Sequence, residues 1–309
     1  MGRGGTPILV DDYRPVRIQH HRNEVIKVMR SGSLGCFIVV SLVSAGLFAH
    51  AQQPKQDPRA QAIVRTAVQT ELDADRNDHS RWRYRSTVRK PEGTFVYVVV
   101  ETDRGSVKKK IQQDGHPLDS AGLNEEMQRI EAFVRDPSQQ ARQRKDSEQD
   151  DKRAENMLRL LPDAFLWSVR NDGADSVTLA FTPDPNFGAS SMETRVFAAM
   201  AGEIVVSKPG SRIQTIKGRL IREVKFGYGL FGHLDEGGTF NVERRQLAPN
   251  IWQITESHIH IIGKALLFKN IGEQEDEVKT DFRPTPPATT LEQAAGLLRG
   301  EPSALAAQR

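Results

Sequence analysis

Cysteine is almost absent from this chain of 309 residues, in which Cys36 is the only one. Cys36 lies in an N-terminal segment that we expect to be removed, so the mature protein would contain no cysteine. Disulfide bonds, thiol catalysis and cysteine-ligated zinc are then excluded. With 38% hydrophobic and 27% charged residues, the chain is still able to form one sizeable core.

An excess of positive charge is also missing once that segment is set aside. Of the 43 basic and 40 acidic residues, six and three lie in residues 1–51, which leaves 37 of each sign in residues 52–309. Binding to nucleic acid depends largely on positive charge that faces phosphates. We therefore expect no nucleic-acid partner.

Catalytic motifs are scarce: no G-x-S-x-G elbow and no Ser-His-Asp order stands out. A G-x-G-x-x-G pattern occurs at Gly227, Gly229 and Gly232, but a dinucleotide turn needs a helix that starts within the motif. Gly237 and Gly238 follow after only five residues, and a strand-like pattern comes next. The pattern therefore favours a corner between strands, and we expect no nucleotide or other cofactor.

His258 and His260 are weak candidates for a metal site, because residues at i and i+2 of a strand point to the same face. Glu256 would share this face, and His233 is near in sequence. The alternative is a polar patch on the wetter face, with the intervening isoleucines in the core. A metal-dependent hydrolase is thus a third interpretation of the chain.

The N-terminal segment resembles a secretion signal. From Ser31 to Gln53 there is no charged residue, and the apolar run LGCFIVVSLVSAGLFA is followed by Ala49-His50-Ala51, a small-x-small cleavage pattern. We expect cleavage after Ala51, a periplasmic or secreted protein, and no stable membrane span afterwards; residues 1–28 would then be an over-long start. The alternative is an uncleaved membrane anchor.

The remaining chain predicts one domain over residues 52–282 and a flexible, proline-rich tail over residues 283–309. Asp57 and Pro58 are typical of a helix start, and the helix should end near Asn77. Further helical patterns occur at 123–134, at 137–161, where most residues are charged, and at METRVFAAM. A weak helix, LEQAAGLLR, lies in the tail.

About ten strands lie between these helices. In the first one Trp82, Tyr84, Ser86 and Val88 alternate with polar residues, and short turns such as Gly263-Lys264 separate the later ones. Strands joined by short turns must pair antiparallel. We therefore predict an α+β fold with an antiparallel sheet, in which glycines at strand corners allow sharp bending.

This order of elements, over about residues 57–280, resembles the periplasmic lipoprotein-carrier family of the Lol pathway. The segments TRVFAAMAGEIVV and GKALLFKNIG look similar to those of exported bacterial proteins of the same fold. The resemblance implies a strongly curved antiparallel sheet, an incomplete β-barrel, whose concave side is covered by helices. It also implies an apolar cavity between the sheet and this helical lid, which in the carriers holds acyl chains.

The interpretation that we favour is a non-enzymatic protein that binds an apolar or lipidated ligand, such as a lipoprotein. Its cavity would be lined by Trp82, Tyr84, Phe95, Tyr97, Leu179, Phe181 and Trp252, although the same side chains could equally fill a dry core. The main alternative is a periplasmic scaffold or stress-sensing module that binds another protein through a sheet edge or the charged helix.

Overall fold

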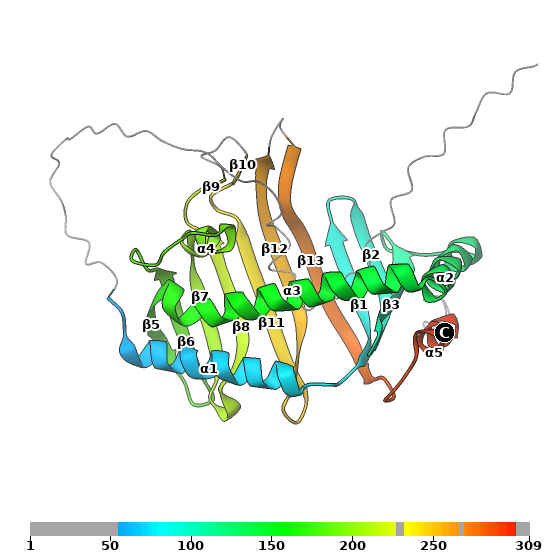
Figure 1. Ribbon diagram of the computed structural model, residues 1–309, viewed down its shortest axis with the longest axis horizontal. Helices are drawn as coiled ribbons and strands as arrows, with labels where there is room; N and C mark the ends of the chain where they lie inside the picture. Colours follow the sequence, from blue (N-terminus) through cyan, green and yellow to red (C-terminus); the bar gives the residue numbers. More distant parts are fainter. Residues whose placement is uncertain (1–54, 227–231, 266–268, 301–309) are drawn as a thin grey trace, which may run out of the picture.

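A computed structural model describes residues 55–226, 232–265 and 269–300. Within these ranges the chain forms five α-helices and one antiparallel sheet of thirteen strands that does not close into a barrel (Figure 1). The predicted fold class is confirmed, with more strands than the ten expected. The predicted leader and the predicted cleavage site after Ala51 lie outside the described residues.

Five helices are found in the described ranges. α1 and α3 each begin with an Asp-Pro pair, and the side chains of Asp57 and Asp136 accept hydrogen bonds from the first free backbone N–H groups. The helices are α1 (Pro58–Asn77), α2 (Ser120–Val134), α3 (Pro137–Ala164), α4 (Met192–Phe197) and α5 (Leu291–Arg299). The predicted start and end of the first helix are confirmed.

The strands form three groups along the chain. The first group is β1 (Trp82–Lys90), β2 (Gly93–Thr102), β3 (Gly105–Gln113) and β4 (His116–Pro117). The second is β5 (Phe165–Asp172), β6 (Ser176–Pro183), β7 (Met200–Ser207) and β8 (Arg212–Leu220). The third is β9 (Val224–Phe226), β10 (Gly232–Leu234), β11 (Thr239–Ala248), β12 (Ile251–Ala265) and β13 (Lys269–Pro284).

The sheet runs in the order β4-β3-β2-β1-β13-β12-β11-β8-β7-β6-β5, and β10 pairs with β9 and with the end of β12. The last strand, β13, therefore lies between β1 and β12 and joins the first group of strands to the rest. The middle of the sheet is thus formed by segments that are far apart in the sequence.

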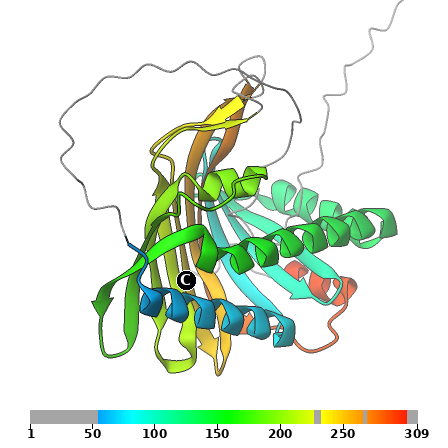
Figure 2. The same ribbon diagram turned by 60° about the vertical axis from the view of Figure 1, so that its left-hand side comes forward.

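One face of the curved sheet carries α1 and α3, which cross it side by side (Figures 1 and 2). The largest apolar core lies between these helices and strands β5 to β12. Val64, Val68 and Leu72 of α1 contribute to it at helical spacing, and Phe240 and Ile259 contribute from neighbouring strands. Helices were predicted to cover the concave side of the sheet, and α1 and α3 form this cover.

The tail differs from the flexible segment that we expected. β13 reaches Pro284, and α5 packs in a second core with α2, β2 and β3 through Leu291, Ala294, Ala295 and Leu298. The valines of β2 in this core alternate with Val99, which shares the face of Tyr84. α5 therefore covers the face of β2 and β3 opposite to that of α1 and α3. Residues 301–309 lie outside the described part.

The predicted turn at Gly263-Lys264 is wrong, because both residues lie inside β12. Gly263 is required there for another reason: a Cβ at this position would stand 2.0 Å from the carbonyl oxygen of His233 on β10. The glycine therefore marks a close approach of two strands. In the described part of the chain, no helix has the length and apolar character that crossing a membrane would require.

Candidate functional site

A cavity of about 280 Å³ lies between α1, α3 and the concave face of the sheet. Most of the side chains around it are apolar. Its lining comprises Glu71, Leu72, Ala74, Asp75, Asp78, Asp151, Ala154, Glu155, Met157, Leu158, Leu161, Phe165, Phe181, Phe197, Arg212, Ile213, Ile216, Phe240, Val242, Arg244, Asn250, Trp252, Gln253, Ile254 and Ser257.

Two glycines shape the floor of this cavity. Gly202 of β7 and Gly218 of β8 are directly opposite each other in the sheet. A Cβ on Gly202 would stand 2.8 Å from the ring of Phe181, and one on Gly218 would stand 2.8 Å from the ring of Phe240. Both rings line the cavity, so the paired glycines provide the space in which its aromatic floor lies.

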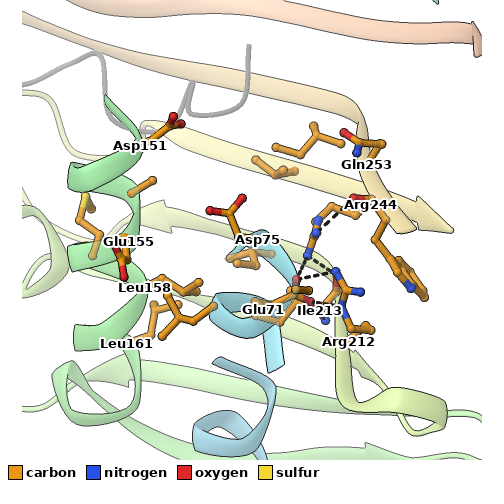
Figure 3. A pocket seen from close by; sticks show the side chains of 18 of the residues that line it. Glu71, Asp75, Asp151, Glu155, Leu158, Leu161, Arg212, Ile213, Arg244 and Gln253 are labelled. Atoms are coloured by element: carbon orange, nitrogen blue, oxygen red, sulfur yellow. Dashed lines mark hydrogen bonds and ion pairs between the residues drawn. The ribbon is translucent and has the colours of Figure 1, made fainter. Parts of the chain in front are cut away.

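One wall of the cavity is a buried ionic network that ties α1 to the sheet (Figure 3). Glu71 is 6% exposed and accepts hydrogen bonds from Arg212 Nε at 3.0 Å and Nη2 at 2.9 Å. It also accepts from the backbone N–H of Ile213 at 2.7 Å and pairs with Arg244 Nη1 at 2.5 Å. One carboxylate of α1 thus connects β8 and β11.

The network keeps Glu71 ionised despite its burial. Burial acts to raise the pKa of Glu71, but the charge of Arg244 and the hydrogen bonds from Arg212 outweigh it, so the pKa lies below its ordinary value of 4.5. The arginines are also held by the chain itself. Arg212 donates to the carbonyl of Asn250 at 3.0 Å, and Arg244 donates to that of Trp252 at 3.4 Å.

Further carboxylates surround the cavity where α1 and α3 face each other. Figure 3 shows Asp75 of α1 pointing toward α3, which carries Asp151 and Glu155. Asp75 and Asp151 are exposed and therefore mark the mouth. Glu155 pairs with Arg159 one turn further along α3, and Asp78 accepts a hydrogen bond from Gln253 at 3.1 Å.

Of the seven side chains expected around a cavity, the structure brings Phe181 and Trp252 to it. Leu179 is fully buried in the same core but does not line the space. Phe165, which was not expected there, lines the cavity and packs against Phe181 with ring centroids 4.7 Å apart. Trp167 also packs against Phe181, at 5.4 Å, but does not line the cavity.

The other four predicted residues lie elsewhere, on β1 and β2. Trp82 and Tyr84 pack around Phe282 of β13, with ring centroids 6.1 and 5.1 Å from it. Phe95 and Tyr97 are half-buried beneath two lysines of β3, Lys110 at 5.6 Å and Lys108 at 4.8 Å. The alternation in β1 predicted correctly that Trp82 and Tyr84 are buried. They were nevertheless assigned to the wrong place, because the sheet carries more than one apolar core and these two side chains belong to a smaller one.

His258 and His260 point to the same face, as predicted, and share one carboxylate. Oδ1 of Asp276 lies 2.8 Å from His258 Nδ1 and 3.0 Å from His260 Nε2, while Glu256 is 3.8 Å from His258. Burial acts to raise the pKa of Asp276, but the two imidazoles outweigh it and lower that pKa. The described part of the chain contains no group of three or more potential ligands arranged to hold a metal ion.

The glycine pattern lies only partly in the described chain, since Gly227 and Gly229 fall outside it. Gly232 opens strand β10, which pairs antiparallel with β9 and β12. No helix begins at Gly232, so the described part of the motif lacks the helix that a dinucleotide site requires.

Glu71 and its two arginines were missed by the sequence analysis, although signals for two of them exist. Glu71 falls on the apolar stripe of α1, next to Leu72 and three residues after Val68, where a solvated carboxylate is not expected. Arg244 continues the buried alternation of Phe240 and Val242 on β11. A charge at a position predicted to be buried indicates a partner.

Comparisons with known proteins give one structural similarity to report. No family model and no curated protein matches the chain. A structure described as a putative outer membrane lipoprotein-sorting protein domain from Vibrio parahaemolyticus is similar over 76% of this chain and 99% of that one, with 9% sequence identity and a TM-score of 0.27. A similarity at this level carries no argument for function.

Proposed function

We propose that this chain is an exported, non-enzymatic protein that binds an apolar or lipidated ligand in the cavity beneath α1 and α3. The observation that supports this best is the cavity itself, in which side chains of three helices and at least four strands surround about 280 Å³ of space. Natural cores are packed without gaps of this size, and such gaps are more typical of ligand sites.

The chemistry of the lining favours an alkyl chain. The apolar lining includes Leu158 and Leu161 of α3, Ile213 and Ile216 of β8, and Phe181 of β6. Burial of each methylene contributes about 0.8 kcal/mol, so about eight sheltered methylenes contribute roughly 6 kcal/mol before the entropy costs of binding. The exposed mouth would hold the polar end of such a ligand.

Export is the second part of the proposal and rests on the leader. The uncharged segment from Ser31 to Gln53 and the pattern Ala49-His50-Ala51 are typical of a cleaved signal. N-terminal sequencing of the protein from its own host should begin at Gln52. An intact leader on the isolated protein would contradict export by cleavage.

A blocked cavity tests ligand binding. Ala154 of α3 lines the cavity, whereas Ala141 of the same helix is exposed. Native mass spectrometry of protein from its own host should show a bound amphiphile for the wild type and for Ala141→Trp, and none for Ala154→Trp. Equal Tm values for the two variants would show that the helix still packs. An empty wild-type protein that also fails to bind added alkyl probes would contradict the proposal.

A further inference from the structure

The cavity is elongated, and its two ends differ. Along α3 its lining runs from Asp151 to Leu161, which is about 15 Å at about 1.5 Å per residue. Asp151 is exposed, and so is Asp75 of α1, which points toward α3 (Figure 3). Phe165, which directly follows the last residue of α3, lines the cavity beyond Leu161 and is 2% exposed. The cavity therefore leads from an exposed mouth to a buried end.

The buried end is closed by aromatic rings. Phe181 of β6 and Phe197 of α4 also line the cavity, and their ring centroids lie 4.7 and 5.3 Å from that of Phe165. They are 3% and 5% exposed. Trp167 packs against Phe165 and Phe181 at 5.9 and 5.4 Å but does not line the cavity, so it forms a second layer behind them. An alkyl chain that enters at the mouth would therefore end against these rings.

The volume of the cavity limits how much of a ligand it can hold. Ligand sites for drug-sized molecules have about 300–1,000 Å³, and the value of about 280 Å³ found here lies just below that range. A water molecule takes about 30 Å³ in the liquid and a methylene group takes a similar volume, so there is room for about nine methylene groups. Two chains of this length would need about twice the space.

We propose that the ligand inserts one alkyl chain of about nine carbons, end first, and that Phe165, Phe181 and Phe197 set the longest chain that the cavity shelters. This inference rests on the proposed function and adds the number and the length of the chains. The terminal methyl group lies against the three rings, and the polar head group lies at the mouth. Any further carbons remain outside the mouth, where they add little to the binding energy.

A series of alkyl phosphocholines tests the length limit: hexyl, octyl, decyl, dodecyl and tetradecyl. Each is titrated into the protein of residues 52–309 by calorimetry, below its critical micelle concentration. Each added methylene should tighten binding about three- to fourfold up to decyl, and the affinity should then stay constant. Dioctanoyl phosphatidylcholine has the same head group and two chains. It should bind within about threefold of octyl phosphocholine, because the second chain remains outside the cavity.

Variants locate the limit at the aromatic end. Phe181→Ala should shift it to longer chains, since a large-to-small substitution leaves part of the removed volume as a cavity. This variant should bind dodecyl phosphocholine about tenfold more tightly than decyl phosphocholine, whereas the wild type should bind the two alike. Phe197→Ala should have a similar effect. Phe133→Ala is the matched control, because Phe133 is 4% exposed in the core of α2 and α5 and does not line the cavity.

The outcomes separate the two proposals. If no phosphocholine binds, the proposed function fails. If the affinity rises through tetradecyl, or if the two-chain lipid binds far more tightly than octyl phosphocholine, the cavity still binds alkyl chains but the limit of one short chain is overturned. The role of the rings is overturned if folded Phe181→Ala and Phe197→Ala show no preference for dodecyl, or if Phe133→Ala shows the same one. The wild-type series decides the length limit even if an alanine variant does not fold.

Discussion

Replacing Glu71 by glutamine should detach α1 from the sheet more than any exposed substitution on that helix. Glu71→Gln keeps the shape of the side chain but leaves the buried guanidinium of Arg212 and the half-buried one of Arg244 without their carboxylate. Breaking a buried pair by removing one partner costs about 3–5 kcal/mol. Because glutamine can still accept one hydrogen bond, we expect a loss of about 3 kcal/mol in the free energy of unfolding.

Thermal unfolding followed by circular dichroism measures this loss. For a domain of this size, about 3 kcal/mol corresponds to a decrease of roughly 6–12 °C in Tm. Asp163→Asn is the matched control: Asp163 pairs with Arg65 of α1 at 2.6 Å, but their side chains are 61% and 59% exposed. Such pairs contribute less than about 1 kcal/mol.

A double-mutant cycle makes the test specific to the network. Arg244→Gln in the Glu71→Gln background should cost less than Arg244→Gln alone, because the charge that it removes is already unpaired. If Glu71→Gln lowers Tm no more than Asp163→Asn does, or if the two substitutions add, the network does not hold α1 on the sheet.

Three further predictions concern the pH dependence of the Glu71 network, the docking of α5 and a glycine of β8. The pKa of Glu71 is lowered in the folded state, so the stabilisation that the ionised carboxylate gives to the folded state is present above about pH 4.5 and is lost as pH falls through the folded-state pKa. Acid should therefore destabilise the wild type more than Glu71→Gln. Urea unfolding at a series of pH values measures this difference. Leu298→Ala should cost about 2–4 kcal/mol and Leu297→Ala little, since these neighbours in α5 are 0% and 38% exposed; equal effects would mean that α5 is not docked. Gly218→Ala should lower Tm by several degrees, because its Cβ would stand 2.6 Å from a backbone oxygen, whereas Gly188→Ala, with open space around it, should not.

Local patterns were enough to predict α1, the antiparallel pairing and the α+β class, whereas the incomplete barrel with helices on its concave side came from the resemblance to a known family. Asp57 and Pro58 start the helix, and its buried residues recur at helical spacing. In β1, Trp82 and Tyr84 alternate with half-buried polar residues, as expected for a strand with two different faces. These signals depend only on neighbours in the sequence.

The full length of strand β13 was not predicted, because charged residues occupy both of its faces and its sequence does not alternate between apolar and polar residues. Glu275 and Glu277 lie on the face covered by helices and are 2% and 1% exposed, while Asp276 between them faces the other way. Their charges are accommodated by other strands: Lys90 of β1 pairs with Glu275, and Ser86 donates to Glu277 at 2.5 Å. Partners so distant in the sequence leave no local signal.

The cavity lining was only partly predictable for a related reason. Phe181 and Trp252 were found because large apolar side chains are usually buried, but burial does not specify which core a side chain enters. Trp82 and Tyr84 are just as buried and pack around Phe282 instead. Their assignment depends on the position of β13, which the local sequence did not reveal.

A crystal structure of residues 52–309 with a bromine-terminated alkyl chain bound is the most direct test of ligand binding between the helices and the sheet. The anomalous signal of bromine locates the end of the alkyl chain without reference to any model. We predict one bromine peak beneath α1 and α3, close to Leu158 and Phe181. Bromine found only on the outer surface, with side chains filling the space between the helices and the sheet, would contradict the proposal.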